Sequence, residues 1–229
     1  IFCGLLILGV PIAVCMALSS IIIFVTATSM PDFLAAQRMQ YAVDSFTQLA
    51  IPFFILAGNL MNAGGISKRI VDFASSLVGH IKGGLAQVML VAAMILSGVS
   101  GSAYADASML GTLLLPDMRK RGYPNDTSSV ILASGTTVGP VIPPSIQMVI
   151  FGVTASVSIG RLMIGGIIPG IIMGLSLMVI AYIQAKKGNW SAFEKASWKE
   201  RYRATKEAFF ALFMPIVVLG GMLTGFFTA

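Results

Sequence analysis

One apolar stretch, from Gly83 to Pro116, carries polar residues where a membrane-spanning helix is usually most apolar. Its middle, Ser97–Asp106, contains two glycines, three serines and a single carboxylate. Backbone groups that a helix break releases in the hydrocarbon core cost several kcal/mol each unless protein, water or a bound solute satisfies them. Such breaks therefore persist mainly where they line a cavity. We predict a broken helix that holds an ion.

The composition places the chain in a lipid bilayer. Of its 229 residues, 56% are hydrophobic and 10% are charged, and the mean hydropathy is +0.89, whereas soluble domains carry roughly 25% charged residues. The formal net charge of +6 could indicate nucleic-acid binding. The basic residues, however, fall in short blocks between apolar runs without interleaved aromatics. This pattern is typical of the loops that connect membrane-spanning helices. We expect an all-α integral membrane protein with no nucleic-acid partner.

Enzymatic chemistry finds little support in the residues. The two cysteines lie in the first apolar run and His80 is the only histidine, so neither a disulfide framework nor a metal centre with the usual ligand spacing is available. An intramembrane aspartyl protease needs paired aspartates at depth, where only Asp106 qualifies. A serine protease needs a buried base, but His80 stands beside Lys82 at a surface. We expect no enzyme, no catalytic residue and no organic cofactor.

Polar residues between the apolar runs divide the chain into segments. About 20 apolar residues are needed to span a bilayer, and shorter apolar pieces suit the limbs of a hairpin. The first run, Ile1–Thr26, is predicted as a helix that accommodates Pro11. The chain opens and closes in apolar runs, so we expect a piece of a longer protein. The predicted order is scaffold helices over 1–65, an amphipathic surface helix over 66–82, a re-entrant hairpin over 83–118, a broken helix over 124–160, a span over 161–186, a cytoplasmic basic amphipathic linker over 187–207 and the start of another span over 208–229.

The distribution of basic residues favours a hairpin over a single span at 83–118. The two limbs meet at Gly101–Ser102. If residue 1 lies inside, a hairpin places every lysine and arginine except Arg38 and Arg161 in the cytoplasm, as the positive-inside rule predicts. A through-span would instead put the basic cluster at 119–121 on the side opposite to the basic residues before the hairpin.

The tip of this hairpin could serve a cation and an anion together. Its serines supply hydroxyl oxygens, its glycines expose carbonyls, and a helix that ends there presents partial negative charge to sodium. The limb that starts at Ser102 directs free N–H groups to the same place, which suits an anionic substrate. The alternative is structural: glycine and serine allow close helix packing in membranes, and Asp106 caps the second limb.

A second break strengthens the functional interpretation. Three prolines and two glycines fall within the eleven residues 135–145, and no helix continues through them. Paired discontinuities at similar depth indicate a binding site near the middle of the membrane. Tyr104 could stack on substrate or simply line the hairpin.

These residues resemble the large membrane subunit of the tripartite ATP-independent periplasmic (TRAP) transporters, a permease family that includes C4-dicarboxylate and sialic acid systems. The resemblance covers most of the chain. The matching stretches are Gly9–Ala13, Ala50–Asn59, Met61–Gly65, Ser97–Ala103, Ala105–Asp106, Val138–Ser145, Ser158–Gly160 and Gly166–Gly170.

The resemblance implies a sodium-driven, elevator-type secondary transporter in the bacterial inner membrane. A periplasmic binding protein would deliver an organic acid, a small four-helix membrane subunit would complete the scaffold, and this multi-span chain would be the first of two inverted repeats. Sodium is then the only metal expected, as the coupling ion. The implied sodium-site residues are Ser100, Gly101, Ser102, Ala103, Asp106, Gly135, Thr136, Thr137, Gly139 and Pro140. We predict Ser102, Tyr104, Pro143 and Ser145 as the substrate-site residues.

Two other functional classes stay open at this point. A passive scaffold or assembly subunit would tolerate alanine at Ser102 and Asp106 without loss of uptake. An ion channel could use a glycine-rich filter, although a hairpin followed by a second broken helix fits an occluding site better than an open pore.

Overall fold

The computed structural model describes residues 1–27, 33–43, 52–53, 56, 60, 63–224 and 226. Every regular element in these ranges is a helix, so the all-α prediction is confirmed for them. Residues 1–49 and 50–229 form separate compact units, which are described one at a time. The helices are α1 (Phe2–Ile7), α2 (Ile12–Ala27), α3 (Phe33–Val43), α5 (Ile66–Val78), α6 (Gly84–Ser100), α7 (Ala103–Lys120), α8 (Asn125–Thr136), α9 (Ile146–Thr154), α10 (Ile159–Lys187) and α11 (Trp198–Leu223).

The first apolar run is two helices and not one, which corrects the prediction that a helix over Ile1–Thr26 accommodates Pro11. Gly9 has φ of +76°, and its N–H donates to the Leu6 carbonyl while the Val10 N–H donates to Leu5. This pattern is a Schellman motif, which ends a helix at a left-handed glycine. Pro11 then precedes the first residue of α2, so its missing N–H removes no helical hydrogen bond. The stretch 50–59, one of those that carry the family resemblance, lies mostly outside the described residues.

The second unit is built around α6, which contacts α5, α7, α8, α10 and α11. Nearly all of its residues are buried, and they form one apolar core with Leu110 and Leu114 of α7. At 17 residues, α6 is about 25 Å long, shorter than the roughly 30 Å hydrocarbon core of a bilayer. Because nearly all residues of α6 are buried, protein surrounds this helix on most sides.

Two residues join α6 to α7. Gly101 ends α6 with φ of +60°, and its N–H donates to the Ser97 carbonyl at 3.0 Å. Ser102 has extended backbone and caps α7 by accepting the Ala105 N–H at 3.4 Å. The helices thus meet at the predicted Gly101–Ser102. That this hairpin is re-entrant in the membrane stays a prediction.

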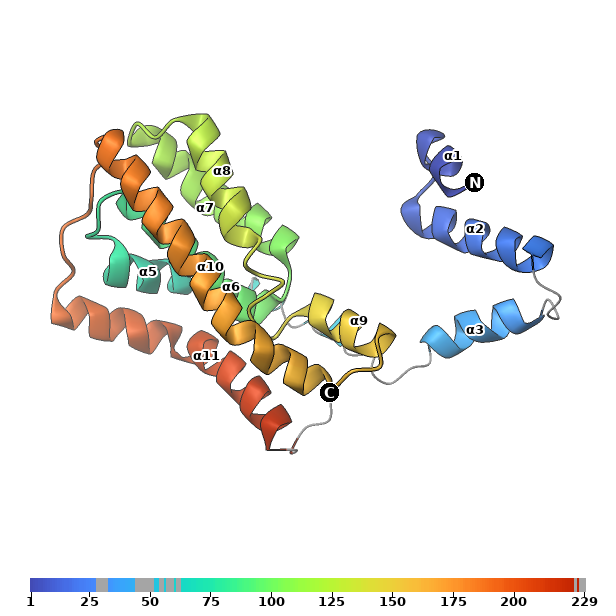
Figure 1. Cartoon of the computed structure of the whole chain (residues 1–229). Coiled ribbons are helices and arrows are strands. Elements are labelled where there is room, and N and C mark those ends of the chain that lie inside the picture. The colour runs from blue at the N-terminus through green and yellow to red at the C-terminus, as the bar shows by residue number, and fades with distance from the viewer. Residues whose placement is uncertain are drawn as a thin grey trace. The chain divides into compact units, whose positions relative to one another are not determined.

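The next predicted helix is interrupted between α8 and α9, over Thr137–Ser145 (Figure 1). The predicted break began at Gly135, but Gly135 and Thr136 still belong to the last turn of α8. The reason is that Pro140 excludes helix only from its own position and restricts the residue before it. α9 begins after Ser145, whose hydroxyl accepts the Met148 N–H at 3.4 Å.

Two helices among the described residues are long and apolar enough to cross a bilayer, α10 and the part of α11 up to Gly221. α10 contains 29 residues, or about 43 Å of helix. It runs alongside α6, α8 and α9 (Figure 1). The dimensions agree with an integral membrane protein.

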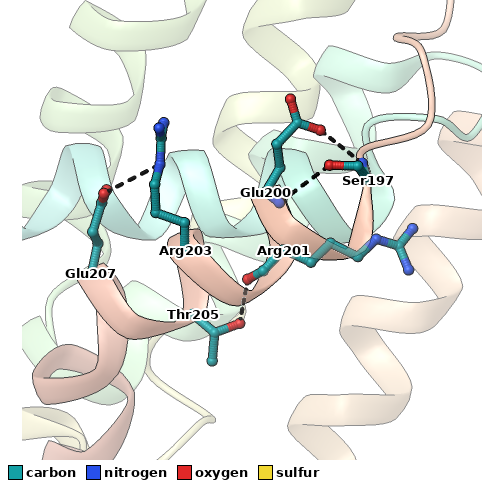
Figure 2. A network of polar contacts seen from close by, with 6 residues as sticks. All are labelled: Ser197, Glu200, Arg201, Arg203, Thr205 and Glu207. Atoms are coloured by element: carbon teal, nitrogen blue, oxygen red, sulfur yellow. Dashed lines mark hydrogen bonds and ion pairs between the residues drawn. The ribbon is translucent and has the colours of Figure 1, made fainter.

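α11 begins at Trp198 and so crosses the predicted boundary between linker and span at residue 208. Ser197 and Glu200 explain the early start: the Ser197 N–H donates to Glu200 Oε2 at 2.7 Å, and the Glu200 N–H donates to Ser197 Oγ at 3.3 Å (Figure 2). This reciprocal pair is a capping box. An ion pair of 3.5 Å between Arg203 and Glu207 follows one turn later. The irregular part of the predicted linker is therefore limited to residues 188–197.

α5 lies against α6 and α11 through a stripe that includes Ile70 and Ala74, spaced four residues apart. Its basic residues Lys68 and Arg69 are exposed. This two-sided character agrees with the amphipathic pattern of 66–82. Its predicted position along the membrane surface stays a prediction.

Candidate functional site

The hairpin tip and the break between α8 and α9 lie directly against each other. A methyl group placed on Gly101 would lie 3.1 Å from the Pro144 carbonyl oxygen and 3.3 Å from the Ile146 nitrogen. A methyl group placed on Gly139 would lie 3.1 Å from Ser97 Oγ. Both approaches are tighter than ordinary van der Waals contact. The structure therefore brings together the two discontinuities that the sequence showed separately.

Asp106 is the ionisable group of this contact. It lies in the first turn of α7 and is 0% exposed. Ser100 Oγ donates to Asp106 Oδ1 at 2.7 Å, while Ser97 Oγ is 3.4 Å from Oδ2 and 2.6 Å from the Ala93 carbonyl. Since a hydroxyl has one proton, the shorter bond to Ala93 is the one that Ser97 makes well.

Asp106 forms no ion pair with any residue that the structure describes. The N-terminal end of α7 favours a negative charge there, but only by about 0.3 to 1 kcal/mol at an exposed helix end and up to about 2 kcal/mol in partly buried geometries. A buried carboxylate is far more costly than this unless it is paired and hydrogen bonded. The arrangement can accept a cation as the missing partner.

Several carbonyl oxygens at the end of α6 are available as ligands. In the described part of the chain, the carbonyls of Gly98, Val99 and Ser100 accept no hydrogen bond. The hydroxyls are less free, because Ser100 Oγ accepts the Ser102 N–H at 3.1 Å and Ser102 Oγ caps α7. The tip thus offers mainly backbone oxygen and the Asp106 carboxylate.

The break between α8 and α9 also offers backbone carbonyls, and not side-chain hydroxyls, as possible ligands. Thr136 Oγ1 donates to the Leu132 carbonyl at 3.0 Å and Thr137 Oγ1 donates to Ser134 at 2.6 Å, so both hydroxyl protons are used inside α8. The carbonyls of Thr137, Gly139 and Pro140, by contrast, accept no backbone hydrogen bond from the described residues.

The predicted sodium-site residues do not all lie in the contact. Ser100, Gly101 and Asp106 form the hairpin side, and Gly139 approaches the Ala103 nitrogen, with a placed methyl at 3.6 Å. Gly135 instead packs against Leu90 of α6, and the Thr137 side chain is exposed.

The four predicted substrate-site residues differ strongly in exposure. Pro143 and Ser145 are buried, and Ser145 is occupied as the cap of α9. Ser102 is half-buried, and Tyr104 is 86% exposed. The structure therefore does not gather them on one surface of this chain.

Three contributors to the contact are not among the implied sodium-site residues, although the hairpin tip predicted from the sequence includes Ser97 and Gly98. Ser97 touches both Asp106 and Gly139, and Gly98 approaches the Pro143 carbonyl, with a placed methyl at 3.4 Å. The signal for Ser97 was its spacing of three from Ser100 on one helix, which puts both on one face. Gly166 of α10, which packs on the break, had no local signal.

Comparison with known proteins gives one family. Residues 1–229 match the family described as "Tripartite ATP-independent periplasmic transporter, DctM component". Over 225 residues the chain is 42% identical to the sialic acid TRAP transporter large permease protein SiaM of Vibrio cholerae, which covers 98% of this chain and 53% of that protein. It is also 42% identical over 221 residues to the 2,3-diketo-L-gulonate TRAP transporter large permease protein YiaN of Escherichia coli, covering 96% and 52%.

A third relative, the C4-dicarboxylate TRAP transporter large permease protein DctM of Vibrio cholerae, is 39% identical over 226 residues, covering 98% of this chain and 50% of the relative. The chain thus spans about half the length of the curated relatives it matches. The resemblance drawn from the sequence motifs is confirmed. The chain belongs to the DctM component family of the tripartite ATP-independent periplasmic transporters.

Proposed function

We propose that this chain is the first half of a permease subunit that imports an organic acid through the bacterial inner membrane, coupled to sodium and working by an elevator mechanism. The observation that carries the proposal is the contact between the hairpin tip and the break beside buried Asp106. Membrane transporters place substrate and coupling-ion sites where discontinuous helices meet.

Sodium fits the chemistry of the contact. The available groups are backbone carbonyls and one carboxylate, which are hard oxygen ligands suited to a hard cation. The C-terminal end of α6 adds partial negative charge in the same place. The described residues hold no group of three or more histidine, cysteine or acidic residues, the arrangement a transition metal would require.

An organic anion fits the beginning of α7. The backbone N–H groups of Ala103 and Tyr104 have no acceptor among the described residues. Free N–H groups at a helix N-terminus bind anions. The relatives are named for sialic acid, 2,3-diketo-L-gulonate and C4-dicarboxylate, which are all organic acids. We therefore propose an organic acid as the substrate class.

The proposed mechanism also involves partners. The family name describes a three-part system, and we propose that the permease works with a periplasmic binding protein and a small membrane subunit of four helices. A second inverted repeat would supply the remaining substrate contacts. The burial of α6 by five neighbouring helices supports movement of the hairpin and the break as one body.

The test is uptake by the full-length assembly in proteoliposomes, with the binding protein added. We expect uptake of an organic acid to require an inward sodium gradient and the binding protein, and to cease when potassium replaces sodium. Uptake that persists without sodium would contradict the coupling. Uptake that does not saturate with substrate concentration and does not depend on the binding protein would favour a channel.

A passive scaffold makes the opposite prediction for point variants. If the chain only assembles the complex, Ser102→Ala and Asp106→Ala should assemble and transport normally. If it holds the coupling ion, both should lower the apparent sodium affinity at normal expression.

A further inference from the structure

α10 packs against the break as well as against α6. A methyl group placed on Gly166 would overlap the Val141 carbonyl oxygen and the Met148 methyl carbon. One helical turn further, a methyl group on Gly170 would lie 2.5 Å from Ile142 Cγ1. Two glycines four residues apart therefore let the backbone of α10 approach two consecutive residues of the break.

We propose that Gly166, with a smaller contribution from Gly170, is a positioning residue for the cation site. It sets how far the carbonyl groups of the break stand from the hairpin tip and thereby determines the affinity for the cation. This inference rests on the proposed function, because it assigns a role at the same site.

The hairpin and α10 both pack on the break. In the hairpin, Gly98 approaches the Pro143 carbonyl and Gly101 approaches the Pro144 carbonyl. In α10, Gly166 approaches the Val141 carbonyl. Inside the break the backbone makes few hydrogen bonds of its own, such as Val141 and Ile142 N–H to the Val138 carbonyl. Its position is therefore set by its neighbours.

The two glycines of α10 should differ in effect. At Gly166 one obstacle is a backbone carbonyl, which moves only if the break moves. At Gly170 the nearest obstacle is the end of the Ile142 side chain, which can rotate away, and the Ile142 nitrogen is 3.4 Å distant. Misplacement of reacting groups by about 1 Å can cost an enzyme on the order of 100-fold in rate, and we expect a comparable sensitivity for groups that coordinate an ion.

The chain provides a matched control in the adjacent residue. A methyl group placed on Gly165 meets nothing within 4 Å among the described atoms. Gly165→Ala and Gly166→Ala change helix propensity in the same direction and by the same amount, in favour of alanine. Only Gly166→Ala should displace the break.

The experiment measures sodium dependence in the full-length assembly. The sodium concentration for half-maximal thermal stabilisation and for half-maximal uptake is compared between wild type, Gly165→Ala, Gly166→Ala and Gly170→Ala. We expect an increase of about tenfold or more for Gly166→Ala, a smaller increase for Gly170→Ala and none for Gly165→Ala.

A double variant separates positioning from simple crowding. Met148→Ala removes the side-chain obstacle at Gly166 but leaves the Val141 carbonyl in place. Gly166→Ala/Met148→Ala should therefore keep the weakened sodium affinity. Full recovery would overturn the proposal.

If Gly166→Ala does not assemble, Gly170→Val provides the test, since its larger side chain should push Ile142 and raise the sodium requirement.

The outcomes distinguish the two proposals. If wild type shows no sodium response, the proposed function fails. If wild type responds and Gly166→Ala matches Gly165→Ala in sodium dependence, the positioning role fails while the proposed function stands.

Discussion

Two proline-containing interruptions of apolar helix lie among the described residues, at 8–11 and at 137–145, and they differ in what surrounds them. A methyl group on Gly9 meets no described atom within 4 Å. The second interruption is enclosed by the hairpin tip and by α10, through Gly101 and Gly166. A broken helix thus becomes a candidate site where other elements pack into the break.

Both interruptions leave backbone carbonyls without a backbone donor among the described residues. In the first, the N–H groups of Gly9 and Val10 donate back to α1, but the carbonyls of Ile7, Leu8 and Gly9 accept no backbone hydrogen bond, and no other described element packs on Gly9. The second leaves the carbonyls of Thr137, Gly139 and Pro140 without a backbone donor in the described part of the chain. At membrane depth such groups need a partner. The comparison predicts that ligand-dependent effects of mutation concentrate at the second interruption.

The largest effect is expected for Asp106→Asn, which keeps the shape of the side chain and removes its charge. We expect the apparent sodium affinity of the intact transporter to fall about 10- to 100-fold, equivalent to about 1.4 to 2.7 kcal/mol. Sodium titration of uptake in proteoliposomes measures it. Asp117→Asn is the matched control on the same helix, because its ion pair of 3.5 Å with Lys120 is largely exposed. Equal effects of the two variants would remove Asp106 from the site.

An intermediate effect is expected for Gly101→Ala, and Gly9→Ala is its counterpart in the first interruption. Both glycines have positive φ, +60° and +76°, so each alanine should cost about 1 to 2 kcal/mol of stability. Only Gly101→Ala brings a methyl group to 3.1 Å from the Pro144 carbonyl. We therefore expect similar losses of thermal stability but weakened sodium binding in Gly101→Ala alone. Weakened binding in both would break the contrast between the two regions.

The smallest effect is expected for Ser102→Ala. It removes the cap of α7, which should cost about 1 kcal/mol, and Ser158→Ala should cost about the same at the start of α10. Ser102 also adjoins Ser100 and the free N–H groups of α7. Sodium-dependent thermal stabilisation should therefore weaken a few-fold in Ser102→Ala and stay normal in Ser158→Ala. Unchanged sodium dependence in both would move the site away from the tip.

Much of the fold could be predicted because its signals are local. The Gly101–Ser102 turn and the cluster of prolines from Pro140 to Pro144 are local signals, so the approximate positions of both breaks followed from the sequence. Single prolines are accommodated inside α7, α10 and α11 and mark no break. The capping box at Ser197 and Glu200 was also local, but the apolar run that begins at residue 208 concealed it. The predicted boundary therefore fell ten residues after the start of α11.

The site could be predicted only in part because its packing is long-range. Nothing near Gly166 in the sequence indicates that it touches Val141, and nothing near Gly139 indicates Ser97. Nor does the sequence indicate that the hydroxyl groups of Thr136 and Thr137 already donate their protons to backbone carbonyls of α8. Residue type identified the possible ligands, whereas tertiary contacts decide which oxygens remain free.

The most direct test is a density map of the intact, full-length complex in sodium, at a resolution that shows bound ions, compared with a map in potassium. We predict density in sodium that contacts oxygen atoms from both the hairpin tip and the break at 137–145, and its loss in Asp106→Asn. A sodium ion bound elsewhere, with this contact closed and dry, would contradict it.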